Sequence, residues 1–123
     1  AAPSNRVAHL ALGNLYFRQR NFALAEENYK AAVQGDKEDV PALIGLGLVC
    51  ERTTRLKDAE KYLRSAIVLD PNSPTVMNNL GSVLERQGRT AEAKAFYQKA
   101  LSVDPNHADA KKNIARLSPQ AKP

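Results

Sequence analysis

Residues 74–107 of this 123-residue chain are PTVMNNLGSVLERQGRTAEAKAFYQKALSVDPNH. In the first half of this stretch Val76, Leu80 and Val83 are four and three residues apart. This spacing places apolar side chains on one face of an α-helix. We therefore expect an amphipathic helix over about 74–87.

Residues with strong helix-end preferences mark the boundaries of the expected helices. Ser73 has a side-chain oxygen that can cap free amides, and Pro74 suits the first helical position, where its missing N–H costs nothing. Gly88 permits the left-handed backbone that often closes a helix. A second amphipathic helix is expected over about 90–103, and Pro105 prevents its continuation. The stretch is thus predicted to be a helical hairpin.

The same pattern occurs three times, at a spacing of 34 residues. The columns in this register are Leu12-Gly13, Leu46-Gly47 and Leu80-Gly81; Ala25, Ala59 and Ala93; Tyr29, Leu63 and Tyr97; and Ala32, Ala66 and Ala100. Pro71 and Pro105 also lie 34 residues apart, with Lys37 at the corresponding place in the first unit. The units are 6–39, 40–73 and 74–107. A lone hairpin cannot cover its apolar stripe, so successive hairpins are expected to stack.

These columns resemble the tetratricopeptide repeat (TPR) family over nearly the whole chain. The resemblance implies an all-α fold, an α-solenoid of three antiparallel helical hairpins. Residues 108–117 place two apolar side chains on one side and predict a terminal capping helix, the seventh helix. We expect a single domain over 1–118 and a flexible tail at 119–123. The terminal stretches AAPSN and SPQAKP have the composition of linkers.

Composition and charge narrow the classes of function. With 18 Lys and Arg against 13 Asp and Glu, the net charge of +5 favours acidic partners. The chain has a single cysteine, Cys50, which excludes an internal disulfide and a cysteine-based zinc site. Cys50 occupies the same repeat position as Tyr16 and Leu84, so we expect its side chain to be buried. His9 and His107 are too few and too far apart for a metal or catalytic site.

No apolar stretch approaches the ~20 residues needed to cross a bilayer. We expect a soluble fragment, without membrane insertion, of a longer protein. The compartment is left open between cytoplasm and periplasm, and a membrane-associated parent protein is one alternative.

The resemblance also implies a binding groove, because the first helices of successive repeats line a concave surface in this family. A peptide or a partner helix from another protein is the expected ligand, with apolar anchors in the first two repeats and polar groups in the third. Counting repeat positions predicts the groove residues Leu10, Asn14, Phe17, Arg18, Ile44, Leu48, Arg52, Asn78, Asn79, Ser82, Arg86, Lys112, Asn113 and Arg116.

The sequence bears on two features of this groove, a carboxylate clamp and a row of arginines. The carboxylate clamp of chaperone adaptors in this family maps onto Leu10, Asn14, Gly45, Thr75 and Asn79, where its three basic residues are absent. The chain is therefore not expected to be such an adaptor. Arg18, Arg52 and Arg86 recur at the repeat spacing and either grip an acidic strip or belong to a solvated face that Glu51 and Glu85 partly neutralise.

Other classes of function remain as alternatives. The chain is either a binding scaffold or a structural module that assembles with itself or docks onto a larger protein. Leu10, Phe17 and His9 on the first helix have no preceding hairpin to cover them in this sequence, so we expect them to contact either missing upstream sequence or a second copy of the chain. RNA binding is less favoured because the groove offers no stacking aromatic besides Phe17. No nucleophile, base and orienting group recur together, so neither an enzyme nor a cofactor is expected.

Overall fold

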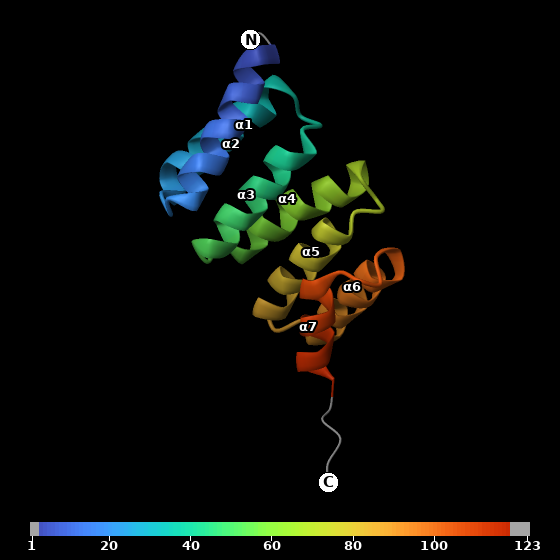
Figure 1. Cartoon of the computed structure of the whole chain (residues 1–123). Helices are drawn as coiled ribbons and strands as arrows, with labels where there is room; N and C mark the ends of the chain where they lie inside the picture. The colour runs from blue at the N-terminus through green and yellow to red at the C-terminus, as the bar shows by residue number, and fades with distance from the viewer. Residues whose placement is uncertain (1–2, 119–123) are drawn as a thin grey trace. The chain divides into compact units, whose positions relative to one another are not determined.

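The computed structural model of the chain describes residues 3–118, and this part consists of seven helices without a strand (Figure 1). The helices are α1 Pro3–Arg18, α2 Phe22–Gly35, α3 Val40–Arg52, α4 Leu56–Leu69, α5 Pro74–Arg86, α6 Thr90–Val103 and α7 Ala108–Leu117. The all-α prediction is confirmed. The predicted tail at 119–123 lies outside the described residues.

Helical contacts divide the chain into two compact units, residues 1–71 and 72–123. In the first unit α1 packs on α2, α2 on α3 and α3 on α4; in the second α5 packs on α6 and α6 on α7. A single domain over 1–118 stays a prediction.

The beginning of α1 corrects the linker expected at the N-terminus. The helix starts at Pro3, so residues 3–5 are helical. A proline is tolerated there because the first amides of a helix have no acceptor within it.

Side-chain caps set the starts of α3, α5 and α7 at equivalent places in the repeat. Asp39, Ser73 and His107 accept hydrogen bonds from backbone amides three residues later, at 3.0, 3.2 and 3.2 Å. The cap expected at Ser73 is confirmed. His107 caps α7 through its ring Nδ1. This cap could not be predicted from the residue type, because histidine is not among the preferred N-cap residues.

The core of the first unit is built around Tyr29. A Cβ atom added at Gly13 of α1 would lie 2.6 Å from its ring, and one added at Gly45 of α3 would lie 2.5 Å from it. The ring therefore fills the space that two glycines leave between α1 and α3. Ala25, Leu46 and Val49 are buried around it.

The second unit repeats this relation between a glycine and a bulky side chain. A Cβ at Gly81 of α5 would lie 2.6 Å from the ring of Tyr97 on α6, while the α3–α4 hairpin pairs Gly47 with Leu63 at 2.7 Å. The Tyr97 ring therefore fills the space that the missing side chain of Gly81 leaves.

The turns inside the hairpins share one backbone conformation. Arg20, Thr54 and Gly88 occupy the same repeat position with φ of 61°, 65° and 83°. Only glycine adopts this left-handed region without steric cost. Two of the three turns therefore carry strain that the third avoids.

Candidate functional site

The α1/α3 face of the first unit consists of the predicted groove residues on these two helices. Leu10, Phe17, Ile44 and Leu48 are half-buried, whereas Asn14 is exposed. Leu10 and Phe17 pack against the core around Tyr29. The face therefore offers partly accessible apolar side chains beside an exposed amide.

The side chain of Asn14 is hydrogen-bonded to the core residue Tyr29. The Tyr29 hydroxyl donates to Asn14 Oδ1 at 2.7 Å. Burial raises the pKa of Tyr29, with nearby Arg18 opposing the shift, so the hydroxyl keeps its proton as donor. Within residues 3–118 the Nδ2 group of Asn14 has no acceptor. One side of this amide is fixed and the other can donate to a ligand.

An arginine–aromatic cluster lies where α1 and α3 end. The rings of Phe17 and Phe22 meet edge to face with centroids 5.5 Å apart. The Arg52 guanidinium lies 5.3 Å from the Phe17 centroid, and that of Arg20 lies 5.6 Å from the Phe22 centroid. Cations over aromatic faces attract the ring quadrupole, so these four side chains form one connected group.

In the second unit the polar groove residues of α5 and α7 bind one another. Asn113 Nδ2 donates to Asn78 Oδ1 at 2.9 Å. Arg116 donates to both carboxylate oxygens of Glu85 and, at 3.0 Å, to Asn113 Oδ1. The Tyr97 hydroxyl donates to Glu85 at 2.8 Å. We call this α5/α7 group the polar network.

The polar network shifts the ionisation of its members. The hydrogen bonds from Arg116 lower the pKa of Glu85; burial opposes this shift, and the weaker effect of the Tyr97 hydrogen bond adds to it. The ion pair raises the pKa of Arg116, and burial together with the Glu85 carboxylate raises that of Tyr97. Glu85 is therefore held as the anion at neutral pH.

The other predicted groove residues differ in their exposure to solvent. Arg18, Arg86 and Lys112 are exposed, and Asn79 and Ser82 are half-buried. Glu85 was expected to neutralise the neighbouring arginine on its own helix, yet it also pairs with Arg116 of α7. Only the placement of α7 reveals this partner, because the two residues are 31 positions apart.

The uncovered edge of α1 differs from the one expected. His9 bonds Asn28, with Nδ1 and Oδ1 3.1 Å apart, and Leu10 and Phe17 face the core, so that prediction was wrong. The exposed apolar residues are instead Val7, Leu12 and Leu15, with exposed fractions of 54, 40 and 40%. In later repeats the columns of Leu12 and Leu15 are buried, at Leu46, Val49, Leu80 and Val83. Among residues 3–118 these core-type side chains of α1 therefore stay exposed, whereas their counterparts in the later repeats are covered.

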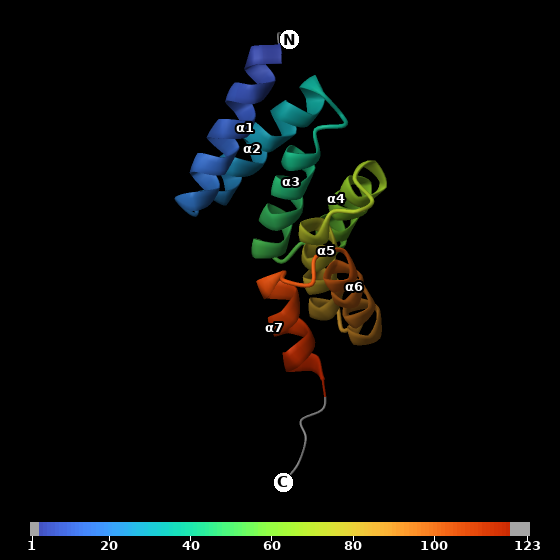
Figure 2. The same ribbon diagram turned by 45° about the vertical axis from the view of Figure 1, so that its right-hand side comes forward.

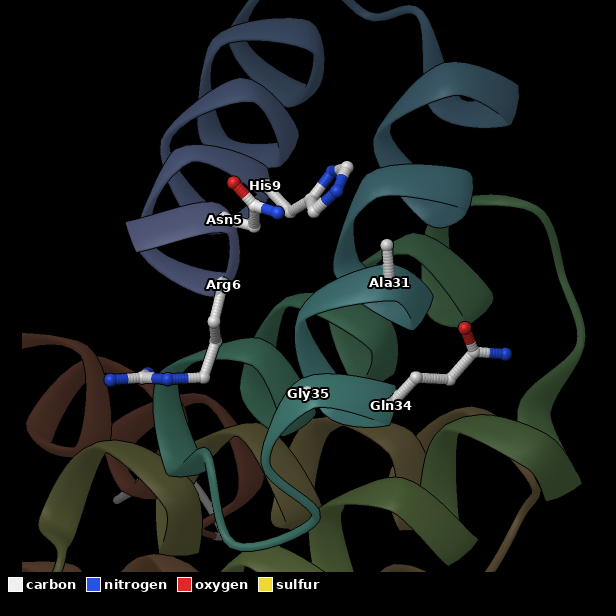
Figure 3. Close-up of a pocket in the computed structure, with 6 residues that line it drawn as sticks. All are labelled: Asn5, Arg6, His9, Ala31, Gln34 and Gly35. Atoms are coloured by element: carbon white, nitrogen blue, oxygen red, sulfur yellow. The ribbon is translucent and has the colours of Figure 1, made fainter. Parts of the chain in front are cut away.

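A pocket of about 380 Å³ lies between α1 and α2. Figure 3 labels the residues that line it: Asn5, Arg6, His9, Ala31, Gln34 and Gly35. The side chain of Arg6 points away from those of His9 and Gln34. Arg6 is held by Asp39 at 2.6 Å. The polar groups therefore do not converge on a common point.

Cys50 is fully buried, as predicted, and burial raises the pKa of its thiol. In the part of the chain that the structure describes, no group of three or more His, Cys, Asp or Glu side chains could hold a metal ion. None of the helices there is long and apolar enough to cross a bilayer.

Comparison with known families agrees with the repeat pattern. Two models described as tetratricopeptide repeat match residues 10–74 and 74–107. No curated protein matches the sequence significantly.

Solved structures resemble the fold closely at low identity. The second TPR domain of human RPAP3, in complex with an HSP70 peptide, has a TM-score of 0.89 at 19% identity, covering 97% of this chain and 100% of that one. The Thermobaculum terrenum O-GlcNAc transferase has a TM-score of 0.87 at 24% identity over 90% of this chain but 21% of the enzyme. MamA has a TM-score of 0.85 at 26% identity, over 93% of this chain and 67% of that one. The predicted helical-repeat architecture is confirmed.

Proposed function

The chain belongs to the tetratricopeptide repeat family, and we propose that it is a non-catalytic scaffold that binds a peptide or a partner helix on the α1/α3 face. The observation that carries the proposal is the half-buried set Leu10, Phe17, Ile44 and Leu48 beside Asn14. Partly accessible apolar side chains gain free energy when a ligand covers them, and a few such anchors dominate most interfaces.

The fixed amide of Asn14 supplies the polar part of this recognition. Its Oδ1 is engaged by Tyr29, so its Nδ2 group donates to a carbonyl of the ligand. Backbone carbonyls occur in every peptide, so this contact orients the ligand independently of its sequence. In the second unit Asn79, Ser82, Arg86 and Lys112 are the proposed contacts, while Asn78, Asn113 and Arg116 reach a ligand only in addition to their bonds in the polar network.

The proposed binding mode is not a carboxylate clamp. The first clamp position is Leu10, which packs on the core, and the third is Gly45, whose Cα lies beneath the Tyr29 ring. A lysine cannot replace Leu10 without losing that packing. The RPAP3 domain binds an HSP70 peptide, and this makes a peptide ligand reasonable here without fixing its chemistry.

Selection from a phage-displayed library of random linear peptides tests the proposal. The chain should enrich a related set of peptides, and the double variant Ile44→Glu, Leu48→Glu should lose that enrichment because charge prevents apolar side chains from packing there. Val68→Glu on α4 is the control, since Val68 is 77% exposed. Circular dichroism must show both variants folded. Equal enrichment by the double variant would place the site elsewhere.

A second function is favoured by the exposed edge of α1. We propose that Leu12 and Leu15 dock onto a helix of a second copy, since α2 covers the same columns in α3. Sedimentation equilibrium should show a mass that rises with concentration, and Leu12→Glu, Leu15→Glu should abolish the rise. A wild-type mass that stays monomeric at high concentration contradicts this docking.

A further inference from the structure

Within residues 3–118 the two arginines of the arginine–aromatic cluster, like Arg18 next to Phe17 in the sequence, lack a carboxylate partner. Elsewhere Arg6, Arg55, Arg64, Arg89 and Arg116 each form an ion pair. Within residues 3–118, Arg18, Arg20 and Arg52 form neither an ion pair nor a hydrogen bond through their side chains. Three exposed guanidinium groups at one end of the first unit therefore have no anionic partner among the described residues.

The aromatic rings hold two of these groups without using their donors. A cation held over the face of a ring by this attraction makes the contact without using its N–H donors in a hydrogen bond. Arg52 comes from α3 and lies over Phe17 of α1, so this contact also joins the two helices of the proposed groove. Arg20 lies over Phe22 although its backbone has a φ of 61°. The rings thus favour these positions of the two cations before a ligand arrives.

We propose that this cluster binds an acidic side chain of the peptide whose apolar residues occupy the α1/α3 face, and this inference rests on the function proposed above. The ends of α1 and α3 lie at the same end of the unit in both views (Figures 1 and 2). Phe17 belongs both to the cluster and to the face, so apolar contacts continue directly into the cationic group. An aspartate or glutamate of the ligand accepts hydrogen bonds from Arg52 and its neighbours, as paired guanidinium and carboxylate groups do.

The charge distribution favours an acidic peptide over a nucleic acid. Residues 1–71 carry ten Lys or Arg and nine Asp or Glu, so the positive charge is local to the cluster. The faces of both rings are already half-buried and covered by guanidinium groups, so they offer no platform for a base. The recognised carboxylate belongs to a side chain within the peptide, because the carboxylate-clamp positions of the first two repeats hold no basic residue.

The phage selection with one added variant tests this inference. Arg20→Asn with Arg52→Gln removes two charges, and asparagine tolerates the left-handed backbone at position 20. Lys57→Gln with Lys61→Gln on α4 removes two charges outside the cluster and is the matched control. Peptides selected by the wild type and by the control should be enriched in Asp or Glu at one position by about tenfold, the ratio expected for a charge-assisted hydrogen bond.

Each outcome of this selection either supports or overturns the inference that the cluster binds an acidic side chain. Loss of the acidic preference in the cluster variant, with the apolar preference kept, supports the inference. An apolar preference without acidic enrichment, or acidic enrichment that survives in the variant, overturns it and leaves the proposed function intact. Selection of no peptide overturns both. Wild-type retention of single-stranded RNA in 150 mM salt, lost in the cluster variant, assigns the cluster to nucleic acid and also overturns the inference.

Discussion

The α1/α3 face and the α5/α7 face are built on equivalent repeat positions, but they satisfy their polar groups differently. On α5 and α7 the groove side chains Asn78, Asn113 and Arg116 bind each other and Glu85. On α1 and α3 the side chains are mostly apolar, and Arg52 lies over a ring. These hydrogen bonds attach α7 to α5. The same repeat positions thus serve stability in one unit and remain accessible in the other.

Gly45→Ala should cause the largest loss of stability. The new Cβ would lie 2.5 Å from the Tyr29 ring, which has no room because Gly13 confines it on the other side. We expect a loss of about 2–3 kcal/mol, more than alanine gains over glycine in a helix. Thermal unfolding followed by circular dichroism measures it. Gly35→Ala, with its nearest neighbour at 3.4 Å, is the control and should be neutral or stabilising.

Comparing Tyr97→Phe with Tyr29→Phe measures the difference between the two faces directly. Tyr97 donates to the charged Glu85, whereas Tyr29 donates to the neutral Asn14. Hydrogen bonds to charged groups are stronger, so we expect losses of about 1.5–2 and about 0.5–1 kcal/mol, respectively. Urea unfolding gives both values. Equal losses would mean that the polar network contributes no more than a single neutral bond.

The polar network should also make stability depend on pH. The pKa of Glu85 is lower in the folded state than its ordinary value of 4.5, so its contribution is complete above about pH 4.5 and is lost as pH falls through the folded pKa. Glu85→Gln should cost about 1 kcal/mol at pH 7, because Arg116 is half exposed, and should flatten the acid dependence. Urea unfolding between pH 7 and 3 tests it. Glu92→Gln should change less, and an unchanged pH profile for Glu85→Gln would contradict the assignment.

Thr54→Gly should have the smallest effect and the opposite sign. Thr54 has a φ of 65°, a region that is unfavourable for a β-branched residue, and the same turn in the second unit has Gly88. Relief of this strain should stabilise the fold by about 0.5–1 kcal/mol after the entropic cost of glycine. Thr53→Gly, at a φ of −99°, should destabilise. A rise in melting temperature for the first variant only would confirm the strain.

The sequence by itself determined the helices, their order and the capping segment. Helix boundaries follow from local rules, because apolar spacing, Ser73 and Gly88 act within a few residues of their own position. The small and aromatic columns also gave the core, since Gly81 has room for the Tyr97 ring only in a close helical pair. Three copies of one pattern fix the register more firmly than one copy can.

Only the tertiary structure decided how the surface side chains are paired. Arg116 with Glu85, Arg52 with Phe17 and Arg6 with Asp39 join residues 31 to 35 positions apart. The exposure of Leu12 likewise depends on which helices pack beside α1, since its own residue type is that of the buried Leu46 and Leu80. Such pairings are worth about 1 kcal/mol each and depend on side-chain conformation across helices. The spacing of apolar residues along one helix does not depend on these pairings. The backbone could therefore be predicted from the sequence, whereas the partners of the exposed charged side chains could not.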